Sequence, residues 1–190
     1  MKVGVLAIQG DFQAHREALE RIGAEALLVK TAAELAGLDA LVLPGGESTT
    51  QMKLLAEQGM LGVLAESARQ GLAVFGTCAG AILLATEVEN PPQASLWLVD
   101  MTVVRNAYGR QLESCVIEAV TDLSGKPLEM VFIRAPMIER VGPQVEVLAS
   151  REGKPVLVRQ GRLLAATFHP ELTGDSTIHS YFLKMVGDGK

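Results

Sequence analysis

The sequence predicts an α/β fold: a three-layer architecture with a mostly parallel central sheet, helices on both faces and additional antiparallel strands in the C-terminal half. In its first half, short apolar runs alternate with stretches of helical periodicity, the pattern of a parallel sheet covered on both faces. After Asn90-Pro91-Pro92, apolar runs follow one another with only turn residues between them, which indicates antiparallel or mixed strands. Neither a repeat nor a linker interrupts the 190 residues, so we expect a single domain over residues 1–190.

The N-terminal elements follow from the spacing of apolar residues, which is continuous in buried strands and recurs every three or four positions in helices. In chain order we expect a strand over residues 2–8, a helix over 12–22 that Gly23 stops, a strand over 26–29, a short helix over 32–35, a strand over 40–43, helices over 50–57 and 61–70, and a strand over 72–75 followed directly by a helix. Parallel sheets bind ligands at the carboxyl ends of their strands, and Gly45-Gly46 and Cys78 both occupy such positions.

The C-terminal elements are shorter and are separated by turn residues. We expect strands over residues 99–105, 115–120, 130–134, 145–149, 156–159 and 163–168, and a closing helix from about residue 176 to 186. Cys115 opens an alternating strand with Ile117 and Ala119, so we expect it to be a small core residue.

Composition and charge exclude several classes of function. A net charge of −5 and 4% aromatic residues argue against a nucleic-acid surface. No apolar run approaches the ~20 residues that a membrane helix needs, and the N-terminus lacks the cleavage site of a signal peptide, so we expect a cytoplasmic protein. The two cysteines form neither a zinc spacing nor a disulfide framework, and no metal site is expected.

The strongest chemical signal is the run Gly76-Thr77-Cys78-Ala79-Gly80, between a predicted strand and a predicted helix. Small residues on both sides of a nucleophile allow the sharp strand-to-helix turn of a nucleophile elbow. The start of the following helix would favour the thiolate over the thiol. We therefore expect Cys78 to be a nucleophile.

A nucleophilic cysteine needs a base and a group that orients the base. Among the three histidines, His169 ends a predicted strand and is followed by Pro170 and Glu171. Residues two apart in an extended segment point the same way, so Glu171 can hold the His169 imidazole in the required tautomer. His15 and His179 fall in predicted helices, where we expect surface or core-edge positions.

Two further features suit a small polar substrate. In Pro44-Gly45-Gly46-Glu47-Ser48-Thr49-Thr50, the paired glycines let backbone N–H groups approach an oxyanion, and Ser48 or Thr49 would cap the next helix. This loop lacks the Lys of a phosphate-binding P-loop, and no dinucleotide fingerprint is present, so no cofactor is expected. Arg105 and Arg134 each close a short apolar run, where a guanidinium suits a carboxylate.

Together these motifs resemble the class I, triad-type glutamine amidotransferases. The likeness is narrower to the glutaminase-subunit family of pyridoxal 5′-phosphate synthase (PdxT/SNO), and it covers about residues 2–186. It rests on six blocks: Leu6-Ala-Ile-Gln-Gly10, Leu43-Pro-Gly-Gly-Glu-Ser-Thr-Thr50, Phe75-Gly-Thr-Cys-Ala-Gly80, Arg105-Asn-Ala-Tyr-Gly-Arg-Gln111, Val131-Phe-Ile-Arg-Ala-Pro136 and Phe168-His-Pro-Glu-Leu-Thr173. The second and fourth blocks are the most specific to this family.

The resemblance implies an enzyme that hydrolyses L-glutamine to L-glutamate and ammonia through a glutamyl thioester. The ammonia would pass to a separate, barrel-shaped synthase subunit that makes pyridoxal 5′-phosphate from ribose 5-phosphate and glyceraldehyde 3-phosphate. Members of this family are activated by docking in a large hetero-oligomer. The cofactor is the product of the partner and need not be bound here.

The resemblance also assigns site residues. Cys78, His169 and Glu171 would form the catalytic triad, and backbone N–H groups near Gly46 and Ala79 the oxyanion hole. The glutamine would be contacted by six residues: Gly46, Glu47, Ser48, Arg105, Ile133 and Arg134. Docking of the partner onto Gln9-Gly10 would turn a peptide bond near Gly46 and complete the site.

Two departures from the family pattern are visible: Trp97 replaces a more usual glycine, and Cys115 replaces a phenylalanine. Both concern local packing away from the triad.

The sequence leaves alternative functions open. One is a glutaminase that serves another synthase, and another is a γ-glutamyl hydrolase that acts alone. A redox protein of the same elbow superfamily would often carry a histidine where Ala79 stands. A soluble binding module is the last alternative, and labelling by a glutamine-like electrophile would separate it from an enzyme.

Overall fold

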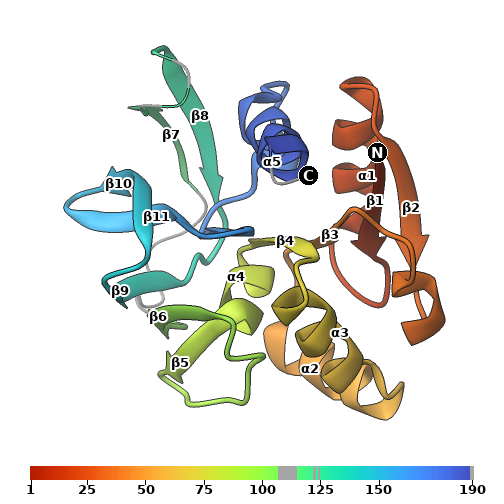
Figure 1. Ribbon diagram of the computed structural model, residues 1–190. Helices are drawn as coiled ribbons and strands as arrows, with labels where there is room; N and C mark the ends of the chain where they lie inside the picture. The colour runs from red at the N-terminus through yellow and green to blue at the C-terminus, as the bar shows by residue number, and fades with distance from the viewer. Residues whose placement is uncertain (107–114, 122, 124, 189–190) are drawn as a thin grey trace.

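The central sheet is mostly parallel (Figure 1). The computed structural model describes residues 1–106, 115–121, 123 and 125–188. Over these residues the sheet has seven strands in the order β10-β11-β12-β4-β3-β1-β2. The parallel strands are β1 (Lys2–Leu6), β2 (Glu25–Val29), β3 (Ala40–Leu43), β4 (Ala73–Thr77) and β12 (Leu163–Ala166). The antiparallel edge consists of β10 (Glu146–Arg151) and β11 (Lys154–Gln160).

Helices cover both faces of this sheet. On the upper face in Figure 1 lie α1 (Phe12–Arg21) and α5 (Thr177–Asp188). On the lower face lie α2 (Ser48–Glu57), α3 (Met60–Arg69) and α4 (Ala79–Leu84). Among the described residues, short 3₁₀ helices lie at η1 (Ala32–Leu35) and η3 (Pro170–Leu172).

The core is divided into two clusters because successive strand side chains point to opposite faces. In β3, Leu41 and Leu43 join the cluster under α2, α3 and α4, whereas Ala40 and Val42 join the cluster under α1 and α5. A strand that is buried on both faces is apolar at every position. Such strands can therefore be recognised in the sequence as continuous apolar runs.

In the described part of the chain, two smaller sheets lie beside the central sheet. A three-stranded sheet joins β5 (Ala85–Glu89), β6 (Val99–Val104) and β9 (Met137–Val141), with β5 and β6 parallel and β6 and β9 antiparallel. The antiparallel pair β7 (Cys115–Val120) and β8 (Pro127–Phe132) packs beside α5, on the core cluster of the upper face.

The predicted fold class is confirmed, and the differences lie in single elements. The strands β5 and β9 were not predicted, because both carry charged residues and neither is a clean apolar run. The strand predicted over 130–134 begins at Pro127 and ends at Phe132. Ile133 and Arg134 therefore lie beyond the strand, where they line a pocket. The predicted strand 163–168 likewise ends at Ala166. No helix in the described part of the chain is long and apolar enough to span a membrane.

The expected surface or core-edge positions of His15 and His179 are wrong, since both side chains are fully buried between α1, α5 and the sheet. Burial is tolerated because the two imidazoles bond to each other and His15 also bonds to Thr77. Cys115 is only half-buried and packs at the edge of the core. Trp97 is 64% exposed.

Candidate active site

Cys78 lies between β4 and α4 in a backbone conformation that side chains rarely adopt. Its φ is 46° and its ψ is −102°, so the turn is strained for a residue with a Cβ. Its N–H donates to Ala166 O at 2.8 Å, and its carbonyl accepts from Ile82 N at 3.2 Å. The predicted nucleophile elbow is therefore the observed geometry of this turn.

The two glycines of the elbow permit close backbone approach. A Cβ on Gly76 would lie 2.5 Å from the carbonyl carbon of Gly80, and one on Gly80 would overlap the Leu43 carbonyl oxygen. Neither overlap could be relieved by rotating a side chain. The spacing Gly-x-Cys-x-Gly is thus required for α4 to start directly above β3 and β4.

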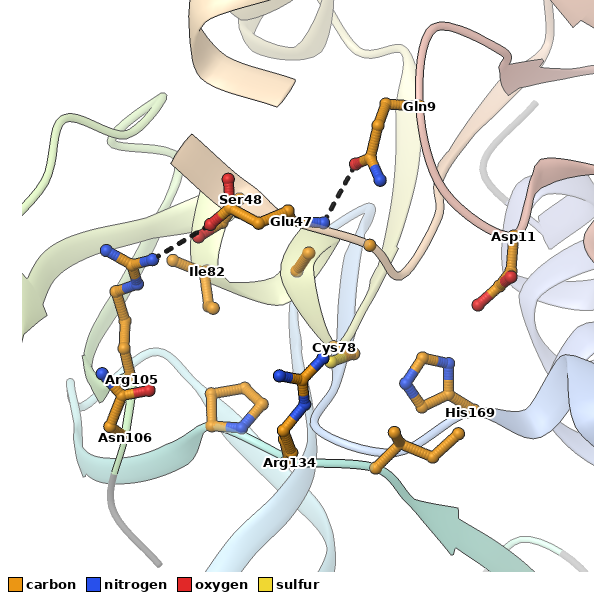
Figure 2. Close-up of a pocket in the computed structure, with 14 residues that line it drawn as sticks. Gln9, Asp11, Glu47, Ser48, Cys78, Ile82, Arg105, Asn106, Arg134 and His169 are labelled. Carbon is orange, nitrogen blue, oxygen red and sulfur yellow. Dashed lines mark hydrogen bonds and ion pairs between the residues drawn. The ribbon is translucent and has the colours of Figure 1, made fainter. Parts of the chain in front are cut away.

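Strand pairing brings His169 to Cys78. Strands β4 and β12 are parallel neighbours with Thr77 opposite Ala166, so both chains leave the sheet at the same edge. His169 is fixed from behind by its N–H, which donates to Val131 O at 2.8 Å. The Cys78 thiol lies near enough to the His169 ring to raise the pKa of that ring, and both residues line the pocket of Figure 2.

Glu171 lies behind His169, away from Cys78. Its Oε1 accepts a 2.7 Å hydrogen bond from His169 Nδ1. The carboxylate is fully buried, and Pro170 begins the short 3₁₀ helix η3 that places it there. Cys78, His169 and Glu171 therefore form a continuous chain of contacts, with the sulfur on the pocket side.

Burial and hydrogen bonding oppose each other in this chain of contacts. Burial of the His169 ring lowers its pKa, but the neighbouring Cys78 and the hydrogen-bonded Glu171 outweigh burial and raise the pKa to about 10. Burial raises the pKa of Glu171, and the hydrogen bond from His169 opposes that rise. The shared proton therefore resides on His169 Nδ1, facing an ionised Glu171.

A pocket of about 410 Å³ opens beside Cys78, within the size range of small-molecule sites. It is lined by Gln9, Asp11, Gly46, Glu47, Ser48, Cys78, Ala79, Ile82, Arg105, Asn106, Ile133, Arg134, Pro136 and His169. In Figure 2, His169 and Asp11 lie on one side of Cys78, and Arg105 and Asn106 on the other. Of the predicted site residues, only Glu171 and Gly10 do not line this pocket.

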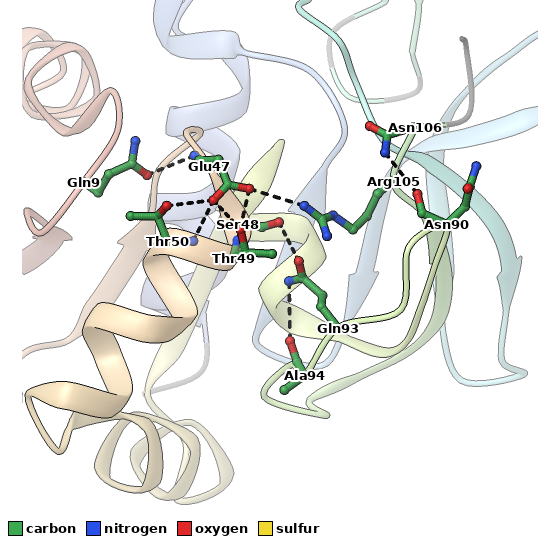
Figure 3. A network of polar contacts seen from close by, with 10 residues as sticks. All are labelled: Gln9, Glu47, Ser48, Thr49, Thr50, Asn90, Gln93, Ala94, Arg105 and Asn106. Carbon is green, nitrogen blue, oxygen red and sulfur yellow. Dashed lines mark hydrogen bonds and ion pairs between the residues drawn. The ribbon is translucent and has the colours of Figure 1, made fainter.

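Glu47 is the centre of a polar network on the Arg105 side (Figure 3). Its carboxylate accepts from the backbone N–H groups of Thr49 and Thr50, from both of their hydroxyls and from Arg105 Nη2 at 3.3 Å. Burial raises the Glu47 pKa, but the threonine hydrogen bonds prevail and lower it to about 2. Glu47 therefore caps α2, and the expectation that Ser48 or Thr49 would do so is wrong. The Ser48 hydroxyl instead donates to Gln93 Oε1 at 2.8 Å.

The segment Gln9-Gly10 is packed tightly against the Gly45-Gly46 turn. Gln9 Oε1 accepts from Glu47 N–H at 2.9 Å, and Gln51 Nε2 donates to Gln9 O and Pro44 O. Gly10 has a φ of +103°, and a Cβ there would overlap the Gly45 carbonyl oxygen. A shift of Gln9 is thus coupled directly to the peptide between Gly46 and Glu47.

Sequence reasoning missed four pocket residues: Asp11, Ile82, Asn106 and Pro136. Asn106 and Pro136 stand within the motif blocks that carry the resemblance, which could have indicated them. Residues 107–111 of the Arg105 block lie outside the described residues. Ligand atoms of Asp11, His169 and Glu171 lie within 4.8 Å of one another, and two members of this group, His169 and Glu171, are already bonded to each other.

Comparison with known proteins agrees with this geometry. The SNO glutamine amidotransferase family matches residues 5–188. The chain is 56% identical to the "Pyridoxal 5′-phosphate synthase subunit PdxT" of Koribacter versatilis, with 100% of this chain and 97% of that protein covered. Identity to the PdxT of Thermotoga neapolitana is 52%, with 98% and 100% covered. A crystal structure described as a glutamine amidotransferase superimposes with a TM-score of 0.91 at 50% identity, covering 97% of this chain and 98% of that one. The chain therefore belongs to the SNO glutamine amidotransferase family.

Proposed function

We propose that this chain is the glutaminase subunit of a pyridoxal 5′-phosphate synthase, with Cys78, His169 and Glu171 as its catalytic triad. The contact chain from the Cys78 thiol through His169 to Glu171, open to a pocket at the sulfur end, is the observation that carries the proposal. The relatives named as subunits of that synthase, which match over nearly their whole length, support the choice of pathway.

In the first step, Cys78 Sγ attacks the side-chain amide carbon of L-glutamine. The thiol proton is held by His169, which passes it to the departing nitrogen, so the C–N bond breaks and ammonia leaves. The product on the enzyme is a glutamyl thioester at Cys78. Glu171 keeps the His169 ring oriented and stabilises its protonated form.

In the second step, His169 removes a proton from water, and the water oxygen attacks the thioester carbon. The C–S bond breaks, glutamate forms, and the proton returns to the sulfur. Backbone N–H groups at Gly46 and Ala79 would hold the oxyanion in both steps, and losing one such donor typically costs about 3 kcal/mol.

The amino-acid end of glutamine would bind on the side of the pocket away from His169. Arg105 and Arg134 offer guanidinium groups to its carboxylate. Glu47 stays ionised across the neutral range because its pKa is about 2, so it can accept the α-ammonium group. Gly46, Ser48 and Ile133 also line the pocket and would contact the glutamine.

Ammonia would pass to a barrel-shaped synthase subunit in a hetero-oligomer in the cytoplasm. Docking near Gln9-Gly10 would move the Gln9 side chain and release the Glu47 N–H that it holds at 2.9 Å. The adjoining peptide could then turn and present an N–H to the oxyanion. Equal glutaminase rates for the isolated chain and the complex would contradict this activation, and would favour a hydrolase that acts alone.

The experiment replaces Cys78 with Ala and measures ammonia released from L-glutamine with the synthase partner present. We expect loss of more than about a thousandfold, because no other group in the pocket can form the thioester. Cys115→Ala is the matched control and should keep the wild-type rate, since Cys115 lies outside the pocket. Substantial activity in Cys78→Ala would refute the mechanism. Activity with a different synthase only would refute the pathway.

A further inference from the structure

Two buried histidines form a polar connection behind the triad that the mechanism above does not use. His15 on α1 and His179 on α5 are joined by a 3.0 Å contact between His15 Nδ1 and His179 Nε2. The other nitrogen of His15, Nε2, lies 2.9 Å from Thr77 Oγ1 and 3.3 Å from Glu171 Oε2. His15 thus connects the residue before the nucleophile with the third member of the triad.

The second oxygen of Glu171 depends on this contact. Among the described residues, Glu171 Oε2 is fully buried and has no aligned hydrogen bond. Its close polar neighbour is His15 Nε2, in an electrostatic contact, while the aligned bond of that nitrogen goes to Thr77. Burying an ionised carboxylate oxygen without a hydrogen-bond partner destabilises the folded protein. A proton on His15 Nε2 would therefore stabilise the charged form of Glu171.

The protonation state of His15 follows from its surroundings. Burial, reinforced by His179 and His169, holds the pKa of His15 well below its usual value, and burial lowers that of His179 to about 4. Both rings are therefore neutral, with one N–H each. If His15 carried its proton on Nδ1, it would donate to His179 Nε2, and its own Nε2 lone pair would face the Glu171 carboxylate. His179 would then carry its proton on Nδ1, an atom that has no hydrogen-bond partner.

The opposite tautomer gives both imidazole N–H groups a partner. His179 Nε2–H donates to His15 Nδ1, and His15 Nε2–H is directed at Thr77 Oγ1 and Glu171 Oε2. Phe75 packs edge-on against both imidazoles, with centroid distances of 6.1 and 5.9 Å, which fixes their ring planes. The donor on His15 is therefore held in place rather than free to rotate away.

We propose that His15 is a positioning residue of the glutaminase site, whose Nε2–H holds the outer oxygen of Glu171 so that the inner oxygen stays directed at His169. His179 fixes the tautomer of His15 from behind. This inference rests on the proposed function, since its effect on rate passes through the triad. Asp11 and Arg21 are the other charged side chains that act on this group, Asp11 on Glu171 and Arg21 on His179.

The test compares His15→Gln with His15→Met, which have equal chain length. The amide nitrogen of Gln reaches the place of His15 Nε2, whereas Met fills the same space without a donor. In the complex with the synthase, we expect His15→Met to lower kcat about tenfold with little change in KM, because it leaves a buried charged oxygen without its polar neighbour. His15→Gln should stay within about threefold of the wild type.

A second readout needs no partner and no activity. With only three histidines in the chain, the imidazole ¹⁵N signals can be assigned by substitution, and the pKa of His169 can be followed in the free protein. His15→Met should lower it from about 10, and His15→Gln should restore it. Phe182→Leu, which weakens the same core cluster beside Phe75, should leave both the His169 pKa and kcat unchanged.

Equal behaviour of the Gln and Met variants, in rate and in His169 titration, would overturn the positioning role. If His15→Met does not fold, His15→Asn replaces it, because its amide reaches the Nδ1 place and not the Nε2 place. A wild-type complex without glutaminase activity would refute the proposed function, and the ¹⁵N titration would still decide whether His15 controls Glu171.

Discussion

At the scale of single residues, the site depends on how a buried carboxylate is kept charged. Glu171 has no exposed side-chain surface, and its pKa is raised by burial. His169 compensates with a 2.7 Å hydrogen bond, and the pair places a protonated imidazole beside the Cys78 thiol. The chemistry that we propose is therefore determined by the balance between desolvation and a short charged hydrogen bond.

Replacing Glu171 with Gln tests that balance. The amide keeps the shape but removes the negative charge, so we expect kcat to fall by roughly 10²- to 10⁴-fold. The pKa of His169 should fall from about 10 toward 6.5. An unchanged rate would refute the orienting role of Glu171.

The stability of Glu171→Gln should also depend less on pH than that of the wild type. In the wild type the folded-state pKa of His169 is raised above the unfolded value of 6.5, so its contribution is fully present below about pH 6.5 and is lost as the pH rises toward about 10. Denaturant titrations at pH 6.5 and pH 9 measure the free energy of unfolding at each pH. Its decrease from pH 6.5 to pH 9 should therefore be smaller in Glu171→Gln than in the wild type.

At the scale of elements, the elbow is possible because α4 lies almost in contact with the backbone of β3. Gly80 is where this contact occurs, since a Cβ there would overlap the Leu43 carbonyl oxygen. The strand-to-helix junction before α2 uses a different solution, in which Glu47 caps the helix with its own carboxylate and bonds to Arg105. Both junctions place functional side chains at the carboxyl ends of neighbouring strands.

Gly80→Ala should destabilise the protein by about 1–3 kcal/mol, the usual cost of overpacking, and should displace Cys78 from His169. Gly62→Ala in α3 is the matched control, because nothing lies within 4 Å of a Cβ built there. That change should stabilise the protein by up to about 1 kcal/mol. Urea denaturation of both variants, compared at the same temperature, checks the prediction. A neutral Gly80→Ala would contradict the tight packing of the elbow.

At the scale of the whole molecule, one sheet separates two core clusters and both support the same site. Strands β3 and β4 contribute alternate side chains to the cluster under α2, α3 and α4 and to the cluster under α1 and α5. A loss of packing on either face would therefore loosen the strand ends that carry Cys78 and Gly46. We propose that residues 1–190 fold as one domain for this reason.

Leu19→Ala and Leu64→Ala remove the same group from opposite faces of the sheet, where both leucines are fully buried. Each should cost about 2–5 kcal/mol and should shift a single thermal transition in calorimetry. A second transition that only one of the two variants moves would show that the faces unfold independently, and would contradict the single domain.

Much of the fold and the site could be predicted from local patterns. Apolar runs and helical periodicity determined the layers, because strands buried on both faces need continuous apolar residues. The elbow around Cys78, the spacing of His169 and Glu171, and the glycine pair before Glu47 are short-range features whose geometry is set by neighbouring residues. The charged strands β5 and β9 lacked such a pattern, and their pairing depends on partners far along the chain.

Only the tertiary structure decided which of these pieces meet. Cys78 and His169 come together because β4 and β12 pair in a register that ends both strands at one edge, and strand register is a long-range property. The sequence indicated helices around His15 and His179, but their side chains were predicted at the surface or at the edge of the core. Their burial beneath Phe75 and beside Glu171 follows from how α1 and α5 pack on the sheet, because packing of distant elements determines whether a polar side chain is exposed or satisfied internally.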